Sequence, residues 1–311
     1  MSNKSKRRAL PVIGRRGFIT AASLAGASVV LTPPVVAEAM PTAPAPTHTA
    51  AEPPTLVADA PINDDVEFAI RYLVVANRIL AHENVVDAYG HVSLRHPRNP
   101  EHYLLARSRS PEQVELGDIV EYTLDGEPVS DTRAPYLERF IHGGIYAARP
   151  DVHAVVHAHS EEVLPFSIST TKLRPVIHDG AFIGAEVPVW DIAEKFGDDT
   201  NLLVSNMAQG RDLARRLGGN SMVLMRGHGF AAAAPSLYEV VRLAVYAPKN
   251  AHVFQAALRL GGKVKPLSKG EIAARVEGPS LKPETPAAKR AWEYWARRAG
   301  VADLLPPRPG K

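Results

Sequence analysis

The chain contains no cysteine among its 311 residues. This absence excludes disulfides, thiolate metal sites and a cysteine nucleophile, so histidine, carboxylate or other oxygen ligands must hold any bound metal. No internal repeat and no glycine-rich phosphate-binding loop occurs in the sequence. Hydrophobic residues make up 45% and charged residues 22%. This composition predicts a globular protein with one large core or two small ones.

An excess of positive charge is present only at one end of the chain. The formal net charge is +3, with 36 basic and 33 acidic residues, but six of the bases and one acid lie in residues 1–39. Subtracting these leaves 30 bases and 32 acids. The body is therefore close to neutral, which removes the electrostatic basis for nucleic-acid binding.

Residues 1–39 have the plan of an export signal. A basic segment, residues 4–16, precedes a mildly apolar run, residues 17–32, and Ala37-Glu38-Ala39 offers a small-residue cleavage site. The Arg15-Arg16 pair resembles the twin-arginine export signal. The run is short and rich in small residues, which argues against a membrane span, although an uncleaved anchor is the alternative. We expect a periplasmic or secreted protein that has no membrane segment after signal removal.

The remaining chain is predicted to form a linker, a catalytic domain and an extension. Residues 40–61, rich in Pro, Ala and Thr, read as a flexible spacer. One α/β domain is expected over 62–265, with strands and helices but no regular βαβ repeat. Residues 266–311 form a C-terminal extension with one helix, Ala287–Ala299. The main expected elements are a helix after Asp64-Asp65, strands at 91–95, 103–106, 119–124, 153–159 and 221–225, and helices at 136–149 and 236–260.

His157 and His159 are the first candidate metal ligands. On a strand, alternate side chains share a face, so these two imidazoles lie side by side at the strand end. The pair alone is a weak signal in a chain with twelve histidines. Two polar residues at a strand end are the plain alternative. His228 strengthens the metal hypothesis because it stands between two glycines directly after an apolar strand, although it can also be an exposed turn residue. Three histidines with an open position are a common catalytic metal arrangement.

Glu138 is the candidate carboxylate of this site. It lies in the first turn of a predicted helix, just before Phe140 and Ile141. A carboxylate there also favours the helix dipole, and spacing alone does not bring it to the histidines.

The ordered motifs resemble the class II aldolase/adducin family over about residues 66–262. They are Gly90–Arg95, Leu137–His142, Arg149-Pro150-Asp151, Val155–His159 and Arg226–Gly229. The resemblance implies a three-layer α/β/α sandwich around a central, mainly antiparallel sheet, and a homotetramer with active sites near subunit boundaries. It also implies one divalent metal ion held by His157, His159 and His228, with Glu138 as the acid/base. Zinc is expected first, with Mn, Fe or Co as alternatives.

Several positions depart from the family's sugar-phosphate aldolases. Tyr136-Leu137 replaces a Ser-Ser pair, residues 106–110 replace a hydroxyl-rich loop, and His91 replaces an Asn. Arg107 and Arg109 share a face if this segment is a strand, and guanidinium forks bind carboxylates; a solvated strand end is the alternative.

The substitutions favour a substrate that carries a carboxylate. The segment Leu173–His178 with Gly180 is similar to the family's branch of decarboxylases. His178 is therefore a second candidate catalytic residue, and Arg107, Arg109, His91 and Tyr246 are candidate substrate contacts, with His178 as a loop residue and Tyr246 as a packed aromatic the alternatives.

We thus expect a metal-dependent carbon–carbon lyase acting on a small carboxylate, foremost a decarboxylase of a hydroxylated aromatic or 2-hydroxy-dienoic acid. The alternatives are an aldolase for a hydroxy-oxo acid or sugar phosphate, a non-catalytic scaffold, and oxygen chemistry on iron at the same histidines.

Overall fold

The structure is a computed structural model that describes residues 66–278 and 283–305. The predicted export signal, linker and Asp64-Asp65 helix start lie outside these residues. Seven strands are described: β1 His91–Arg95, β2 His102–Ala106, β3 Ile119–Thr123, β4 Ala154–Ala158, β5 Val189–Trp190, β6 Met222–Met225 and β7 Gly229–Ala234.

Eight α-helices and four short 3₁₀ helices are found among the described residues. The α-helices are α1 Val66–His82, α2 Arg139–Ala148, α3 Leu164–Ser167, α4 Ala193–Phe196, α5 Met207–Leu217, α6 Leu237–Arg259, α7 Lys269–Val276 and α8 Pro286–Arg298. The 3₁₀ segments include η1 Pro111–Gln113, η2 Leu116–Asp118, η3 His178–Ile183 and η5 Ala302–Leu304. Among the described helices, none combines the length and apolar character that crossing a membrane requires.

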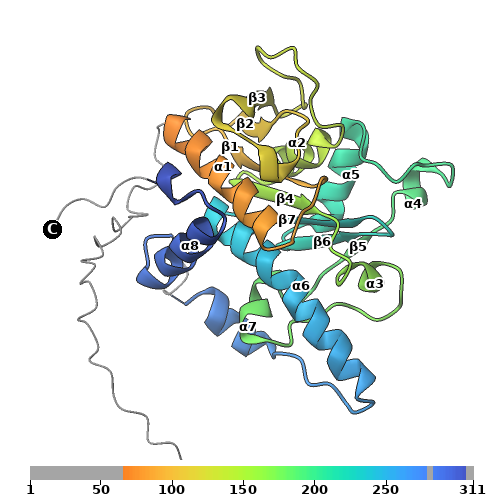
Figure 1. Cartoon of the computed structure of the whole chain (residues 1–311). Helices are drawn as coiled ribbons and strands as arrows, with labels where there is room; N and C mark the ends of the chain where they lie inside the picture. The colour runs from red at the N-terminus through yellow and green to blue at the C-terminus, as the bar shows by residue number, and fades with distance from the viewer. Residues whose placement is uncertain (1–65, 279–282, 306–311) are drawn as a thin grey trace, which may run out of the picture. The chain divides into compact units, whose positions relative to one another are not determined.

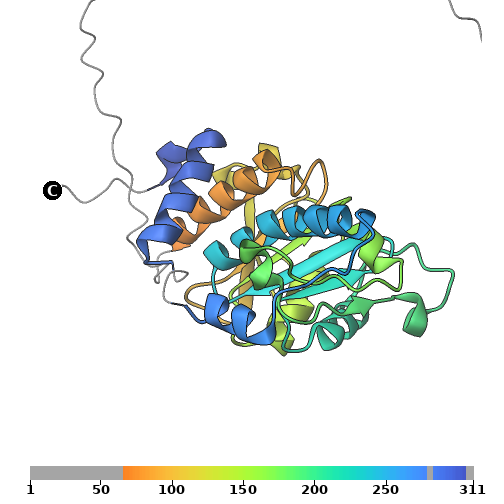
Figure 2. The same cartoon turned by 90° about the horizontal axis from the view of Figure 1, so that it is seen from below.

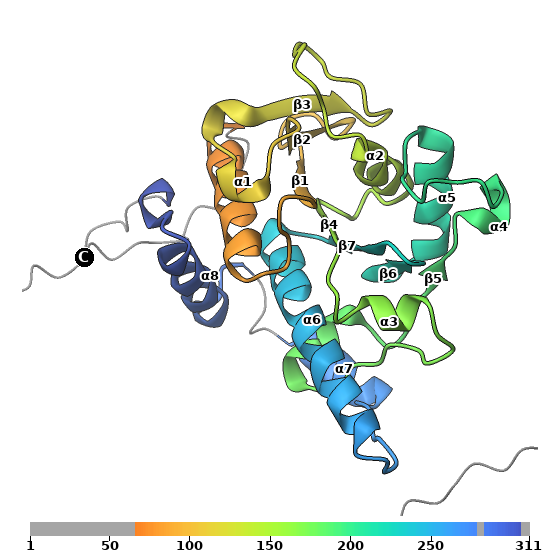
Figure 3. The same cartoon turned by 45° about the vertical axis from the view of Figure 1, so that its right-hand side comes forward.

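One sheet carries all seven strands in the order β3-β2-β1-β4-β7-β6-β5 (Figures 1 and 3). Every neighbouring pair is antiparallel except β5 and β6, which run parallel. Strand β4 is central: His157 lies opposite His91 of β1 on one side and Ala231 of β7 on the other. The predicted mainly antiparallel sheet is confirmed.

Helices cover both faces of this sheet, as Figure 2 shows from below. Alternation along β4 sends Val156 into the core beneath α1 and α6, and Val155 into the core beneath α2 and α5. The predicted three-layer sandwich is thus confirmed. Strands β4, β6 and β7 are buried on both faces, which explains why they read as nearly continuous apolar runs rather than alternating ones.

Most predicted elements fall within a few residues of the observed ones, but α2 starts three residues later than expected. Residues 134–136 are held in an extended path instead, because Arg107 and Pro135 form a β-bridge and the Ser108 N–H donates to the Ala134 carbonyl at 2.8 Å. The sequence patterns did not predict α3, α4, α5, α7, β5 or β7. Strand β7 consists of a glycine, a phenylalanine and four alanines, a composition with little β-propensity.

The C-terminal segment contributes to the core on the α1 side. The α8 helix lies within one residue of its predicted range, and its Trp292 is fully buried. The Trp292 ring stacks on Tyr72 of α1 and Tyr238 of α6, with ring centroids 5.9 and 5.0 Å away. This aromatic contact ties α8 to the two helices that cover the sheet.

Candidate metal centre

The first two histidines meet at the end of β4. His157 is the fourth residue of that strand and is fully buried, and His159 follows one residue beyond the strand. Their Nε2 atoms lie 2.9 Å apart. The small Ala231 opposite His157 on β7 leaves room for the two rings. The predicted placement of both imidazoles on one side of the strand is confirmed.

His228 approaches from the turn that joins β6 to β7. Its Nε2 lies 3.0 Å from the Nε2 of His159. Two glycines make this turn possible. Gly227 has a φ of +65°, which favours glycine, and a Cβ on Gly229 would come within 2.2 Å of the Ala158 carbonyl oxygen. The glycines therefore let the turn place the third imidazole against β4.

Glu138, at the start of α2, completes the cluster. It immediately precedes α2 rather than lying in the first turn, and its side chain does not cap the helix, so the sequence-based placement was wrong by one position. Its Oε1 accepts a hydrogen bond from the Val204 N–H at 3.0 Å. Its Oε2 lies 3.4 Å from the Nε2 of His157 and 3.5 Å from that of His228. The buried carboxylate therefore faces the histidines, a contact that the sequence alone did not establish.

The hydrogen bonds at the outer ring nitrogens fix how two of the imidazoles present themselves. His157 Nδ1 lies 3.0 Å from the Phe230 carbonyl oxygen, and His228 Nδ1 lies 2.9 Å from that of Leu202. A carbonyl only accepts, so both Nδ1 atoms donate, and in the neutral rings both Nε2 atoms carry lone pairs. Backbone carbonyls hold metal-ligating histidines in this way.

The Nε2 atoms of the three histidines lie too close together for the available N–H groups to bridge every pair. One N–H on His159 cannot satisfy both neighbouring Nε2 atoms at 2.9 and 3.0 Å, whereas a cation accepts all three lone pairs. The ligand atoms of the three histidines and Glu138 all lie within 4.8 Å of one another. The donor set therefore fits one divalent ion, and nitrogen plus carboxylate ligands suit Zn, Mn, Fe or Co.

Electrostatics keep the cluster in its metal-binding protonation states. Burial alone would raise the pKa of Glu138, but His157 and His228 outweigh it and hold that pKa far below its usual range. Burial, together with His157 and His228, lowers the pKa of His159 to about 4. Glu138 is thus ionised and His159 neutral at neutral pH, as a metal ligand must be.

A buried polar chain leads away from the cluster. His91 lies beside His157, with ring centroids 5.2 Å apart, and its Nδ1 is 2.6 Å from the Nε2 of His142. His142 Nδ1 is 2.6 Å from the Ser93 hydroxyl, which is 2.7 Å from the Tyr146 hydroxyl. Burial lowers the pKa of His142 to about 3, so this ring is neutral. Sequence reasoning gave no role to His142, although its position four residues after Glu138 places both near one helix face.

Arg107 and Arg109 are not on a strand, because β2 ends at Ala106. Both guanidinium groups turn to one buried carboxylate: Arg107 Nε is 2.8 Å and Arg109 Nη1 is 2.9 Å from Asp118. Burial alone would raise the pKa of Asp118, but the Glu115 N–H and Arg107 lower it. Arg107 and Arg109, which the sequence suggested as substrate contacts, are therefore both paired with Asp118 within the chain.

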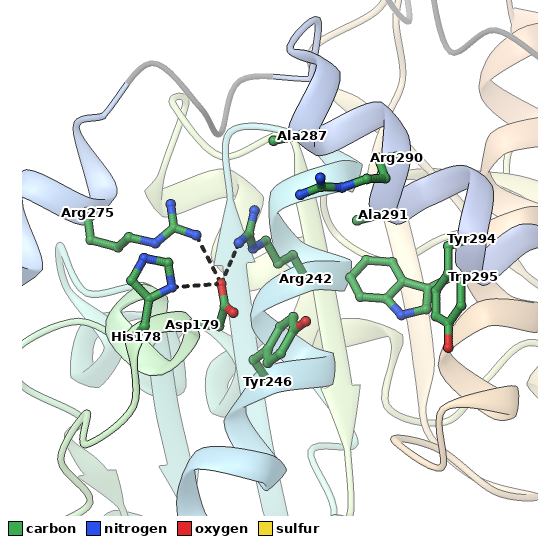
Figure 4. Close-up of a pocket in the computed structure, with 10 residues that line it drawn as sticks. All are labelled: His178, Asp179, Arg242, Tyr246, Arg275, Ala287, Arg290, Ala291, Tyr294 and Trp295. Carbon is green, nitrogen blue, oxygen red and sulfur yellow. Dashed lines mark hydrogen bonds and ion pairs between the residues drawn. The ribbon is translucent and has the colours of Figure 1, made fainter.

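His178 and Tyr246 do not join the cluster within this chain. They line a different pocket together with Asp179 and Arg242 (Figure 4). The space next to the cluster is a cleft of about 230 Å³ that reaches His159 and is lined by residues 84–87 and 159–162. In the chain itself, access to the candidate metal centre is thus beside His159.

Comparisons with known proteins find relatives in sequence and in fold. A family model described as the class II aldolase and adducin N-terminal domain matches residues 71–254. The decarboxylase tropJ of Talaromyces stipitatus is 33% identical over 270 residues, covering 78% of this chain and 98% of that protein. The 3,4-dihydroxyphthalate decarboxylase of Arthrobacter keyseri is 30% identical over 250 residues, covering 74% and 93%. In fold, L-fuculose 1-phosphate aldolase from Glaciozyma antarctica PI12 superimposes with a TM-score of 0.62 at 18% identity, covering 81% of this chain and 98% of that one.

Proposed function

Because the chain belongs to the class II aldolase and adducin family, we propose that it is a metal-dependent lyase that decarboxylates a hydroxylated aromatic or 2-hydroxy-dienoic acid. The family predicted from the motifs is confirmed, and two relatives that span most of the chain are decarboxylases. The observation that carries the proposal is the convergence of three Nε2 atoms and the Glu138 carboxylate.

The three histidines would hold the metal through Nε2, with His157 and His228 oriented by the Phe230 and Leu202 carbonyls. A divalent ion bound there supplies a Lewis acid for the oxygen atoms next to the bond that breaks. The reaction itself replaces a carboxyl group by a proton. The bond between the substrate carbon and its carboxyl group breaks, carbon dioxide leaves, and a proton takes its place on the carbon.

We assign the transfer of that proton to Glu138, whose ionised carboxylate would first accept the proton of a substrate hydroxyl and then deliver it to the carbon that has lost carbon dioxide. The Val204 N–H fixes one carboxylate oxygen and leaves Oε2 facing the histidines. His91 lies on the same side, and its Nδ1 is already engaged by His142, so only its Nε2 is left to contact a substrate. His178 was the other candidate donor, but it lines a separate pocket in this chain.

The test is a substrate and metal assay on the purified protein. We expect carbon dioxide release from 3,4-dihydroxyphthalate or a related hydroxylated aromatic acid, loss of this activity with a chelator, and recovery with Zn²⁺ or Mn²⁺. Aldehyde release from a sugar phosphate, with none of the acids turned over, would replace the decarboxylase with the aldolase alternative. Full activity in the chelator would refute metal dependence. Native protein without metal or lyase activity would favour the scaffold.

We also propose that the chain is exported through the twin-arginine route and works as a homotetramer. The export proposal rests on Arg15-Arg16 and the apolar run that follows, and the tetramer on the family. Changing both arginines to lysine should retain the protein in the cytoplasmic fraction. Light scattering on the mature protein should give four times the chain mass, and a monomeric mass would refute the tetramer.

A further inference from the structure

Four buried polar side chains connect strand β1 to helix α2 beside the metal centre. His91 and Ser93 alternate on β1, so their side chains lie on one face of the sheet. His142 and Tyr146 are about one helical turn apart on α2 and meet them there. Each of the four has an exposed fraction of 4% or less. Such a row costs free energy unless every group finds a hydrogen-bond partner, so packing alone does not explain its presence.

The four groups form one continuous hydrogen-bonded chain. His91 Nδ1 lies 2.6 Å from His142 Nε2, and His142 Nδ1 lies 2.6 Å from the Ser93 hydroxyl oxygen. The Ser93 and Tyr146 hydroxyl oxygens lie 2.7 Å apart. The Tyr146 hydroxyl in turn donates to the His153 carbonyl oxygen at 3.4 Å. The polar chain therefore has a carbonyl at one end and the His91 ring at the other.

The carbonyl end sets the direction in which every hydrogen bond of the polar chain points. Both rings are buried and bond to no carboxylate among the described residues, so each is neutral and carries one N–H. A carbonyl oxygen only accepts, so the Tyr146 proton points to His153. Ser93 then donates to Tyr146, and His142 donates to Ser93 through Nδ1. This leaves His142 Nε2 as an acceptor, and His91 donates to it through Nδ1.

The open end of the polar chain is the Nε2 atom of His91, which then carries a lone pair. Within residues 66–278 and 283–305 this atom has no hydrogen-bond partner. The reverse direction would place an unpaired N–H there, and buried N–H groups without an acceptor are rarer than unfilled acceptors. His91 lies opposite His157 in the sheet, with ring centroids 5.2 Å apart. An acceptor without a partner is thus held beside a candidate metal ligand.

Tyr146 is also held by contacts that do not involve its hydroxyl group. The Arg95 guanidinium lies 4.8 Å from the centroid of its ring, and the centroid of the Tyr103 ring lies 5.5 Å away. Arg95 is itself fixed, because it donates to the carbonyl groups of Val152 and Pro100. The change Tyr146→Phe would therefore keep the packing and remove only the proton that sets the direction of the polar chain.

We propose that the polar chain from Tyr146 to His142 positions His91 as a hydrogen-bond acceptor, so that its Nε2 atom receives the O–H of a substrate hydroxyl group. This hydroxyl is a different one from that whose proton Glu138 accepts. The role rests on the proposed lyase function and adds a group that the site recognises. A hydroxyl whose oxygen faces a cation can only donate, so it needs an acceptor and would lose its hydrogen bond against an N–H.

Solid-state nitrogen NMR of the full chain labelled in histidine reads the direction of the polar chain, with the His91 signals assigned from His91→Ala. We expect the proton on Nδ1 of His91 in the unchanged protein and on Nε2 in Tyr146→Phe, because Ser93 is then free to donate to the neighbouring ring. Tyr103→Phe is the matched control. Tyr103 is buried in the same core, but its hydroxyl donates at 3.0 Å to a backbone carbonyl outside the polar chain, so the His91 tautomer should not change.

Kinetics of the zinc-loaded protein with 3,4-dihydroxyphthalate link the polar chain to the substrate. Tyr146→Phe and Ser93→Ala should each raise KM about tenfold with little change in kcat, because the lost hydrogen bond serves the bound substrate and the transition state alike. Ser93→Thr keeps the hydroxyl and should restore most of the affinity. In a His91→Ala background, Ser93→Ala should have no further effect, since it acts only through that ring. Metal content should stay unchanged in all these variants.

Several outcomes would overturn the proposal. They are a proton on Nε2 of His91 in the unchanged protein, an unchanged tautomer or KM in Tyr146→Phe, and metal loss from that variant. Equal losses from Ser93→Ala with and without His91 would show a purely structural serine and would also overturn it. Failure of the proposed function would look different: the unchanged protein would not turn over the acid, whatever the tautomer of His91, and the substrate role of His91 would fall with it.

Discussion

Replacing Glu138 by glutamine separates its proton-transfer role from metal binding. Glutamine has the same size, and its carbonyl oxygen can still accept from the Val204 N–H, so the local fold should survive. The change removes the negative charge at Oε2, 3.4 and 3.5 Å from two Nε2 atoms. The three histidines remain, and we expect about one metal ion per chain when metal is supplied in excess. Catalysis should fall by about 10²- to 10⁴-fold, the contribution of a positioned acid or base, or about 3–5 kcal/mol of barrier.

The assay combines elemental analysis after dialysis with the initial rate of carbon dioxide release. His159→Ala should give the opposite pattern, because it removes one of three nitrogen donors: metal is lost in dialysis, and activity disappears with it. Glu112→Gln, an exposed carboxylate on η1, is the control and should behave as the unchanged protein. Glu138→Gln protein that contains metal and keeps more than a tenth of the activity would refute the proton-transfer role. Glu138→Gln protein that cannot hold metal would show instead that the carboxylate is an essential ligand.

Three further predictions concern stability. Chelation should lower the melting temperature by about 8–16 °C, because a metal at a thousand times its dissociation constant contributes about 4 kcal/mol and each kcal/mol moves a domain of this size by about 2–4 °C; calorimetry should show no such shift in His159→Ala. The pKa of His142 is about 3 in the fold against 6.5 unfolded, so the unfolded chain binds the extra proton and stability falls as pH drops below 6.5. His142→Asn should remove about 2 kcal/mol of the loss between pH 7 and 5 in urea unfolding, and an unchanged pH slope would contradict it. Asp118→Asn should cost about 2 kcal/mol, between the roughly 0–1 kcal/mol of a surface pair and the roughly 3–5 kcal/mol of a fully buried one, because Asp118 is buried whereas Arg107 and Arg109 reach solvent. A loss below about 0.5 kcal/mol would show that the pair is only a surface contact.

The sequence predicted that the three histidines come together because each of them has a local signature. His157 and His159 alternate on an apolar strand, and His228 stands between glycines that only a tight turn requires. Glu138 had no such signature, since a carboxylate near a helix start has an ordinary explanation. Its role depends on a contact with Val204, 66 residues away, that no local pattern encodes. Only the resemblance to the family's motifs assigned Glu138 to the histidine cluster.

For Arg107 and Arg109, a local sequence pattern was present but misleading. Alternation of Arg107 and Arg109 predicted a shared face, yet the strand ends before them, and both turn to Asp118 because a buried carboxylate needs partners. Their sequence neighbourhood showed two cations without the anion that neutralises them. In contrast, Arg242, Arg275 and Arg290 are scattered over three helices and gave no motif at all. Cation excess is thus a property of the folded surroundings rather than of spacing along the chain.

The sheet itself separates these two sets of groups. Successive residues of β4 point to opposite faces, so the strand that presents His157 to Glu138 presents Val156 to the core of α1 and α6. A change confined to the α6–α8 side therefore has no direct contact with the metal ligands. Within one chain, Arg290→Gln on the α6–α8 side should therefore leave the metal content unchanged. Metal loss from Arg290→Gln would show that the two faces are coupled through the sheet.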